Sequence, residues 1–360
     1  MKITKVDVNL YKFPADKKRV DSIQTFDSMD MPLVDICTDV GLVGTGFTYT
    51  IGNGGRSLKT FIEDDLVPLV IGEDPLNIER IWQKCFWGTH WVNRGGIASL
   101  AMAGIDNALW DLKARYAKLP LHKLLGGAKD RMPVYCTDGG WLHLTEKEVV
   151  EQSAAYIEQG FKAVKMKVGK PDGSEDVRRV RAVRKAIGDD ATLMVDANLI
   201  WTAPRAIDMA RRLEEFNLFW LEEPIEADDV SGHARLARST SIPIAIGENL
   251  YNRFVVKEYI EQGAVGIVQV DAGRIGISEW LKIAFMADSF NLAVSPHFCM
   301  ELHLSLAASV RHSLFVEYFF PLDRVLSVPM KVKDGYLEVP KEPGLGVPFN
   351  RGKLKRYLVT

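Results

Sequence analysis

TLMVDAN at residues 192–198 is a short apolar run that ends in an acidic residue, and the chain repeats this arrangement twice. The two repeats are FWLEEP at residues 219–224 and PIAIGE at residues 243–248. The three acids, Asp196, Glu222 and Glu248, are 26 residues apart. Short apolar runs separated by helical segments of about 10 to 15 residues indicate β/α units with parallel strands. The interval therefore predicts three neighbouring strands that each carry a carboxylate at the carboxyl end.

Eight runs of this kind follow one another after residue 130. They are PVYCTDGG (133–140), AVKMKVG (163–169), TLMVDAN (192–198), FWLEEP (219–224), PIAIGE (243–248), GIVQVDAG (266–273), LAVSPH (292–297) and LFVEYF (314–319). The later runs continue the spacing of polar ends, because Asp271, His297 and Glu317 follow Glu248 at intervals of 23, 26 and 20 residues. Eight successive β/α units predict a closed barrel whose strand ends share one face.

The sequence before and after these runs has a different pattern. Residues 1–130 begin with alternating strand-like segments and continue with amphipathic helices, of which IASLAMAGIDNALWDLKARYA at 97–117 is the clearest. This predicts an α+β domain over residues 1–130 and a barrel over residues 131–322. Residues 323–360 contain a hairpin pattern that is not another barrel unit, and we expect this segment to return to the first domain.

Composition excludes several classes of function. The 360 residues contain 45 Lys and Arg against 47 Asp and Glu, for a formal net charge of -2. Without a long basic run, a nucleic-acid partner is not expected. No apolar run reaches the roughly 18 residues of a membrane span, and the first residues alternate like a strand instead of forming a signal peptide, so we expect a cytoplasmic protein. The four cysteines lack CxxC spacing and predict neither disulfides nor a zinc site.

The acids at three successive strand ends predict a metal site. Because parallel barrel strands end at one face, the carboxylates of Asp196, Glu222 and Glu248 should converge, where their charges repel one another. Carboxylates without thiols or imidazoles are the ligands that Mg²⁺ prefers. The alternative is that these residues are solvated loop acids just past the strands. At the pair Glu222 and Glu223, strand alternation lets only one side chain point inward, and the pattern leaves open which one.

Two lysines lie on the strand that precedes the acids. Lys165 and Lys167 are two residues apart, so both side chains lie on one face. Burial and crowding by a neighbouring cation and a metal lower the pKa of a lysine, which makes Lys167 a candidate general base. Lys165 has two interpretations, a charge pair with a nearby acid or a group that holds a substrate carboxylate.

A second pair of candidate residues lies across the predicted barrel. Asp271 and His297 end consecutive strands, an arrangement in which the carboxylate orients the imidazole and raises its basicity. Glu317 ends the eighth strand. If its surroundings keep it protonated, it donates a hydrogen bond to a developing oxyanion, although a structural carboxylate would have the same sequence pattern.

Together these motifs resemble the enolase superfamily, and within it the mandelate racemase group. The matching motifs are KMK (165–167), VDAN (195–198), EEP (222–224), GEN (247–249), VDAG (270–273), SPHF (295–298) and VEY (316–318). IDNALWDLKAR at 105–115 and LPLHKLLGG at 119–127 resemble the capping domain of that family, so the resemblance covers essentially the whole chain. It implies an α/β fold: a (β/α)7β modified TIM barrel with an α+β capping domain built from the N-terminal region and the C-terminal segment.

The resemblance implies the metal ligands and the kind of substrate. Asp196, Glu222 and Glu248 would ligate Mg²⁺. The resemblance thus implies that Glu222, and not Glu223, is the inward-pointing acid of the pair. The substrate would be a small-molecule carboxylate with a hydrogen on its α-carbon. Asn198 is two residues beyond Asp196 and on the same strand face, and it would donate a hydrogen bond to the substrate.

The resemblance also implies the catalytic groups. Lys167 would serve one face of the α-carbon and His297, oriented by Asp271, the other. Lys165 and Glu317 would stabilise the enediolate that forms when the α-proton leaves. Two bases on opposite faces permit racemisation, or dehydration with His297 as the acid for the departing β-hydroxyl. A binding or structural barrel without catalysis should lack one of these residues, and none is missing.

Weaker likenesses favour dehydration. DGGWLH (138–143), GHARLA (232–237), GFTYT (46–50) and PHFCMELHLSLAAS (296–309) are most similar to acid-sugar dehydratases of the talarate/galactarate type, whereas NLYNRFVVKEY (249–259) departs from that type. We therefore predict a Mg²⁺-dependent dehydratase that converts an aldonic or aldaric acid, such as galactarate or talarate, into a 2-keto-3-deoxy acid. The alternative is a racemase or epimerase of a 2-hydroxy acid such as mandelate.

Two further expectations concern specificity and assembly. Segments 15–30 and 45–56 are rich in Gly, Ser, Thr and Asp, and we expect them to close over the barrel as mobile loops that select the substrate. The family resemblance implies a symmetric homo-oligomer, often an octamer.

Overall fold

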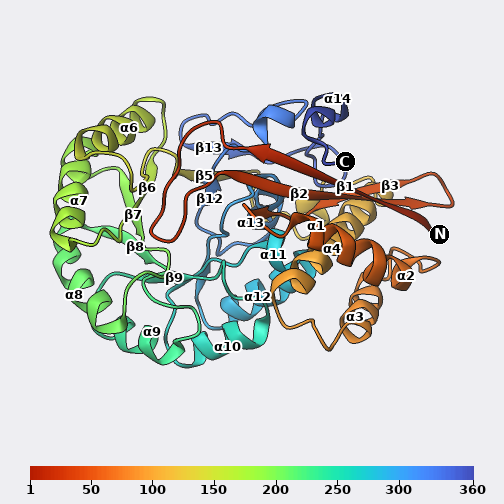
Figure 1. Cartoon of the computed structure of the whole chain (residues 1–360), viewed down its shortest axis with the longest axis horizontal. Coiled ribbons are helices and arrows are strands. Elements are labelled where there is room, and N and C mark those ends of the chain that lie inside the picture. The colour runs from red at the N-terminus through yellow and green to blue at the C-terminus, as the bar shows by residue number, and fades with distance from the viewer.

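The computed structural model describes residues 1–360, and its larger part is a ring of eight parallel strands (Figure 1). In chain order these are β5(Arg131–Cys136), β6(Ala163–Lys167), β7(Thr192–Asp196), β8(Leu218–Glu222), β9(Ile244–Ile246), β10(Ile267–Val268), β11(Ala293–Val294) and β12(Val316–Tyr318). β12 pairs with β5, and a bridge between Val294 and Ser313 closes the ring beside β11. All eight expected runs form strands, so the predicted barrel is confirmed.

Seven helical connections join the strands around the outside of the ring. They are α6(Glu146–Glu158), α7(Gly173–Ile187), α8(Ala203–Leu213) with η2(Glu214–Phe216), α9(Val230–Ala237), α10(Arg253–Glu261), α11(Ala272–Ile275) with α12(Ile277–Ser289), and α13(Met300–Ser309). β6 and β9 are buried along their whole length, as expected for parallel strands covered by helices. The arrangement is the predicted (β/α)7β barrel. None of the helices combines the length and the apolar character that crossing a membrane requires.

The N-terminal part of the chain forms a second domain beside the barrel (Figure 1). Its antiparallel sheet contains β1(Ile3–Pro14), β2(Ser28–Thr38), β3(Val43–Phe47) and β4(Thr50–Ile51), and its helices are α1(Gly55–Thr60), the π-helix η1(Phe61–Leu66), α2(Val67–Val70), α3(Ile78–Gly88), α4(Gly96–Tyr116) and α5(Leu121–Leu124). The backbones of β3 and α4 lie close together, because a Cβ on Gly46 would lie 2.2 Å from the Ala108 nitrogen. Only glycine permits this approach. We call this unit the cap.

Two segments of the cap reach the mouth of the barrel. The loop between β1 and β2 extends toward β6 and β7 (Figure 1), and its buried Arg19 donates to both carboxylate oxygens of Asp138, just after β5. Between β3 and β4, Thr48 donates to the Gly273 carbonyl of α11 at 2.8 Å. These contacts hold both segments over the carboxyl ends of the barrel strands.

The C-terminal segment contacts both domains. After η3(Asp323–Val325), β13(Tyr336–Glu338) pairs antiparallel with β5 of the barrel. Farther on, the Leu121 amide donates to the Gly344 carbonyl, and after α14(Arg351–Leu354) and η4(Lys355–Tyr357) the Val359 amide donates to the Leu10 carbonyl of β1. The segment that was expected to return to the first domain therefore also adds a strand beside β5.

Candidate active site

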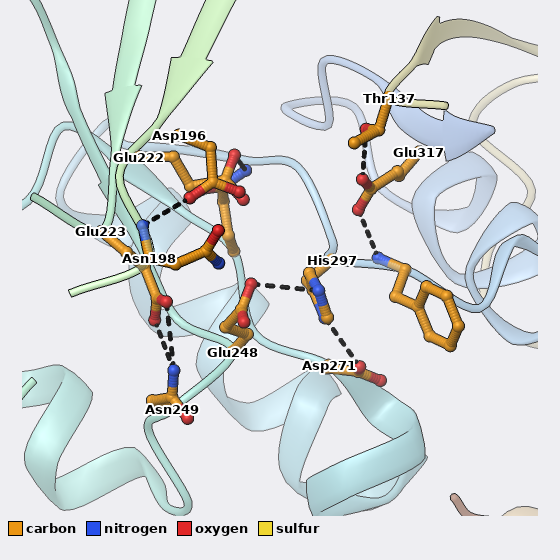
Figure 2. A network of polar contacts seen from close by, with 12 residues as sticks. Thr137, Asp196, Asn198, Glu222, Glu223, Glu248, Asn249, Asp271, His297 and Glu317 are labelled. Atoms are coloured by element: carbon orange, nitrogen blue, oxygen red, sulfur yellow. Dashed lines mark hydrogen bonds and ion pairs between the residues drawn. The ribbon is translucent and has the colours of Figure 1, made fainter. Parts of the chain in front are cut away.

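The nine side chains singled out in the sequence gather at the carboxyl ends of the barrel strands, and we call them the strand-end cluster. Figure 2 shows its acids with Asn198 and His297. Its members are Lys165 and Lys167 in β6, Asp196 at the end of β7 with Asn198 beyond it, Glu222 at the end of β8, Glu248 after β9, Asp271 after β10, His297 after β11 and Glu317 in β12. Seven are buried, and Glu248 and His297 are partly exposed. Residues far apart in sequence therefore form one site.

Both lysines of β6 are paired with acids of the cluster. The Nζ of Lys165 lies 2.6 Å from Glu222 Oε1, 3.3 Å from Glu317 Oε1 and 3.4 Å from Asp196 Oδ2. The Nζ of Lys167 lies 2.5 Å from Asp196 Oδ2. Of the two interpretations of Lys165, the charge pair is the one present here.

These pairs set the protonation of the lysines. Burial by itself lowers the pKa of Lys167, but the Asp196 carboxylate, with Asp21 and Glu222, outweighs burial and the pKa lies above its ordinary value. The pKa of Lys165 is raised further, since Glu222 and Glu317 both oppose the effect of burial. This direction is opposite to the lowered pKa expected for a general base. A cation on Asp196 would compete for the oxygen that holds Lys167.

Glu222 and Glu223 are both buried, which corrects the expectation that only one of them points inward. β8 ends at Glu222, and Glu223 has a left-handed backbone with φ of 40°, so strand alternation no longer applies to it. Asn249 donates to both oxygens of Glu223, at 2.8 and 3.1 Å (Figure 2). Glu223 has no motif of its own, and its position next to Glu222 was the only signal in the sequence that it could belong to the site.

The carboxylates of the cluster carry more negative charge than the lysines neutralise. Burial raises the pKa of Glu222 to about 8, and Asp196, Glu317 and Glu248 add to this against the opposing effect of Lys165. Burial and Glu248 also raise the pKa of Glu223 well above its ordinary value. As the side chains stand, no three acids or histidines surround one point closely enough to hold a metal ion. The donor set nevertheless fits Mg²⁺ in chemistry, because it is rich in carboxylate oxygens and short of positive charge.

His297 lies between two carboxylates (Figure 2). Its Nδ1 lies 3.0 Å from Asp271 Oδ2, and its Nε2 lies 3.0 Å from Glu248 Oε2. Burial lowers the pKa of His297, but Glu248 and the hydrogen bond with Asp271 outweigh it and raise the pKa to about 9. The imidazole is therefore protonated at neutral pH and can give up a proton.

Two residues that the sequence analysis did not assign to the site hold Asp271 in place. The Tyr49 hydroxyl, from the cap, donates to Asp271 Oδ2 at 2.5 Å. The ring of His303 in α13 accepts from the Ala272 amide at 2.8 Å and lies 3.5 Å from Asp271 Oδ1. Tyr49 lies in GFTYT and His303 in PHFCMELHLSLAAS, but neither motif indicates a contact near Asp271, because both contacts join segments distant in sequence.

Glu317 does not meet the condition of protonation on which its role as a hydrogen-bond donor depended. Burial alone would raise its pKa, but Lys165, His297 and the hydrogen bond from Thr137 outweigh burial and lower the pKa below its ordinary value. It accepts hydrogen bonds from the Thr137 hydroxyl and the Phe298 amide (Figure 2). Glu317 is thus an ionised acceptor, because its neighbours are donors and cations.

Asn198 lies beyond the strand on which it was expected. β7 ends at Asp196, and Asn198 follows with φ of 43° in a turn, its amide donating to Asp196 Oδ1 at 2.9 Å. Its side chain lines a cavity of about 120 Å³ between cap and barrel. From the cluster, Lys167, Glu248, His297 and Glu317 also line this cavity. The cavity therefore brings five of the nine candidate residues to one lining.

Comparison with known proteins gives the same architecture. Residues 7–126 match the model of the mandelate racemase / muconate lactonizing enzyme N-terminal domain, and residues 148–353 match the enolase C-terminal domain-like model. The chain is 38% identical to a 3,6-anhydro-alpha-L-galactonate cycloisomerase of Streptomyces coelicolor, over 99% of both chains. It is 40% identical to an L-talarate/galactarate dehydratase of Salmonella typhimurium, over 87% of this chain and 79% of the relative. A solved racemase from Streptomyces coelicolor with bound magnesium has a TM-score of 0.96 at 37% identity, covering 99% of this chain and 100% of that one.

Proposed function

The chain belongs to the mandelate racemase/muconate lactonizing enzyme family of the enolase superfamily, and on that premise we propose that it is a Mg²⁺-dependent acid-sugar dehydratase. It removes the α-proton of an aldonic or aldaric acid, such as galactarate or talarate, and eliminates the oxygen on the next carbon. The observation that carries this proposal is that Lys167 and His297 line one cavity from different sides of the ring. Four strands separate β6 from β11 in one direction and two in the other.

Asp196, Glu222 and Glu248 are the proposed ligands of Mg²⁺, with Glu223 beside them. When bound, Mg²⁺ acts as a Lewis acid that stabilises negative charge on the substrate carboxylate. Support comes from the excess of carboxylates over cations in the cluster: burial raises the pKa of Glu222 to about 8, and Asp196, Glu317 and Glu248 add to this. A site of this kind is stabilised by a divalent cation.

The residues of the chain supply the proton transfers. Lys167 accepts the α-proton once its ion pair with Asp196 is released, and Lys165 stabilises the enediolate of the substrate. The electron pair of the broken C–H bond then forms the double bond to the β-carbon, whose bond to oxygen breaks. His297, held by Asp271 through Nδ1 at 3.0 Å, gives its proton to the leaving oxygen. With a β-hydroxyl the products are water and an enol that tautomerises to the 2-keto-3-deoxy acid.

Two other outcomes use the same groups. If the β-oxygen belongs to a 3,6-anhydro ring, the same elimination opens the ring and releases no water, and the 38% identity to a cycloisomerase over 99% of both chains favours testing this reaction. If no leaving group departs, return of a proton on the other face gives a racemase or epimerase of a 2-hydroxy acid. The leaving group and the fate of the α-proton therefore separate the candidates.

Proton NMR in D₂O with Mg²⁺ tests the proposal. A panel of aldonic, anhydro-aldonic, aldaric and simple 2-hydroxy acids is followed for α-proton exchange and keto-acid formation together. We expect loss of the β-oxygen bond and a 2-keto-3-deoxy product. Exchange or inversion without elimination would instead establish the racemase or epimerase, and no reaction across the panel would contradict both.

Specificity and assembly are separate proposals. Segments 15–30 and 45–56 set substrate preference, since Asp21, Phe26, Tyr49 and Ile51 of these segments line the cavity. Exchange of both segments with those of a family member that prefers another acid should move the preference. A homo-oligomer is expected for the family and is tested by light scattering.

A further inference from the structure

Lys167 has one ion-pair partner in the structure, and the proposed reaction requires that this pair be released. Its Nζ lies 2.5 Å from Asp196 Oδ2 and within ion-pair distance of no other acid. Asp196 is also a proposed metal ligand, so the same oxygen cannot hold Lys167 throughout the reaction. A contact other than a carboxylate must then keep the amine in place.

His297 keeps a polar partner in the same reaction. Its Nδ1 lies 3.0 Å from Asp271 Oδ2, and Asp271 is not among the proposed metal ligands. The imidazole therefore stays oriented even if Glu248, on its other side, is released. The two proton-transfer groups differ in this respect, because only Lys167 loses its polar partner.

The indole ring of Trp141 is the contact that remains beside Lys167. The Nζ of Lys167 lies over this ring, 5.6 Å from its centroid. Trp141 is buried and lines the same cavity as Lys167. The face of an aromatic ring attracts an ammonium group and also packs against an uncharged amine. The ring can therefore hold the side chain and still leave the lone pair of the nitrogen free for the α-proton.

The backbone at Trp141 is tied to the strand that carries Lys167. The Lys167 amide donates to the Gly140 carbonyl at 2.8 Å. A Cβ on Gly140 would lie 2.4 Å from Met166 Cα, so the loop after β5 approaches β6 as closely as only glycine permits. Arg179 of α7 donates through Nη2 to the Trp141 carbonyl at 3.0 Å. The ring thus extends from a backbone that is fixed relative to Lys167.

A buried acid, Asp138, holds the polar edge of the indole. Trp141 Nε1 donates to Asp138 Oδ1 at 3.0 Å, and the Asp138 side chain is fully buried. The loop between β1 and β2, which extends toward β6 in Figure 1, supplies the opposite charge. Arg19 donates to both Asp138 oxygens, at 2.7 and 3.2 Å, and Lys17 Nζ lies 2.8 Å from Oδ2. Loss of either partner of a buried ion pair leaves a costly charge, so these contacts restrain the ring.

Two other aromatic rings pack against Trp141. The ring centroid of Phe26, from the same loop of the cap, lies 5.3 Å away, and that of Phe319, after β12, lies 5.9 Å away. Arg19 in turn lies over the Phe319 ring, 5.1 Å from its centroid. Cap and barrel therefore both contribute contacts that fix the indole beside Lys167.

We infer that Trp141 is a positioning residue for Lys167, and that Asp138 and Arg19 act on Lys167 through it. Once the pair with Asp196 is released, the ring keeps the amine in the cavity and lies against the ammonium that forms when the α-proton is accepted. This inference rests on the proposed role of Lys167 and makes that role dependent on the cap. A reacting group displaced by about 1 Å can lose about 100-fold in rate.

α-Proton exchange into D₂O tests the two faces of the site separately. His297→Asn leaves Lys167 to exchange the proton, and Lys167→Met leaves His297. Trp141→Leu added to His297→Asn should slow exchange of the aldonic and aldaric acids of the NMR panel by about 100-fold, while Kd from calorimetry changes less than about threefold. Added to Lys167→Met, it should change exchange by less than about threefold.

Milder variants repeat the test if Trp141→Leu folds poorly. Trp141→Phe keeps an aromatic ring and loses the hydrogen bond to Asp138, and Arg19→Met leaves Trp141 itself unchanged. Each should slow exchange by Lys167 about tenfold. Trp87→Leu, at an exposed position of α3, is the control and should leave exchange unchanged.

Fluorine NMR tests the contact without any substrate. In protein labelled with 5-fluorotryptophan, each of the eight tryptophans contributes a signal, and Trp141→Phe identifies the signal of Trp141. This signal should shift in Lys167→Met and in Arg19→Met. It should not shift in Lys162→Met, whose side chain is exposed.

The outcomes separate this inference from the proposed function. Equal loss of exchange in the His297→Asn and Lys167→Met backgrounds would overturn the inference, because Trp141 would then act through the fold. A rise in Kd alone would also overturn it and would assign Trp141 to substrate binding. If no acid of the panel exchanges its α-proton with the unaltered enzyme, the proposed elimination is wrong. The fluorine signal then decides by itself, and a Trp141 signal that shifts in neither variant overturns the inference.

Discussion

The strand-end cluster and the apolar lining of the cavity are built in different ways. The strand-end cluster comes from seven barrel strands and the turns after them, its members recur at nearly constant intervals, and almost every charge has a partner. The apolar lining is made of Ile23, Phe26, Ile51, Trp141, Phe298 and Phe319. These residues come from segments of the cap and barrel that share no interval, and they range from buried Trp141 to Ile23, which is 56% exposed. The comparison teaches that the candidate proton-transfer groups lie on rigid strand ends, while the apolar contacts come from segments that connect the strands or cover them.

Removal of the metal is expected to have the largest effect, because the proposed reaction needs Mg²⁺ at the cluster. EDTA should abolish elimination, by at least about 10⁴-fold, and Mg²⁺ should restore it. The readout is keto-acid formation. Glu222→Gln and Glu248→Gln should weaken Mg²⁺ binding in calorimetry, whereas Glu226→Gln, outside the cluster, should not. Full activity in EDTA would show that the reaction does not require a metal ion at the cluster.

The next effect comes from single proton-transfer groups. Lys167→Met should lower kcat/KM by about 10³-fold, since it removes the proposed base for the α-proton. The matched control is Lys162→Met on the same segment. Its side chain is exposed, and we expect the substitution to leave kcat/KM unchanged.

His297→Asn distinguishes the two roles. We expect it to stop elimination while α-proton exchange into D₂O continues, because Lys167 alone can exchange the proton. NMR follows both signals in one sample. Loss of exchange together with elimination would assign the first proton transfer to His297.

A smaller effect is expected where the cap touches the cluster. Tyr49→Phe removes the hydrogen bond to Asp271 Oδ2 and leaves the ring in place. Because Asp271 orients His297, kcat should fall about tenfold while KM changes little. Tyr116→Phe, at an exposed position of the cap, is the control. A rise in KM alone would mean that Tyr49 contacts the substrate and does not position the dyad.

The smallest effect contrasts the paired acids of the cluster with a buried acid that lacks a cation. Glu301 in α13 is buried, its Oε1 has no partner, and burial raises its pKa to about 8 with a further contribution from Asp323. The unfolded chain ionises Glu301 near its ordinary value of 4.5, so its contribution to stability is full below that pH and is lost as the pH rises toward 8.

Glu301→Gln should therefore raise the melting temperature by on the order of a few degrees at pH 8 and by much less at pH 5. Thermal unfolding at both pH values measures this difference. An equal change at the two pH values would show that Glu301 acts through packing and not through ionisation.

The barrel and most of the site could be predicted from the sequence because of one regular feature. Each β/α unit of the chain adds one strand, and parallel strands end at the same face, so Asp196, Glu222 and Glu248 at equal intervals had to meet. Tyr49 and His303 were not accessible, because their contacts with Asp271 and Ala272 join segments that no interval relates.

The sequence by itself thus determined the fold, the family and the set of residues at the strand ends, since periodicity and alternation act through local geometry. Only the tertiary structure decided their charges. Glu317 is ionised, Glu223 is buried beside Glu222, and Lys167 has a raised pKa, because neighbours brought together from distant segments set the cost of each charge. It also decided which residues of the cap and barrel line the cavity together, since the two domains meet there and no local rule relates their segments.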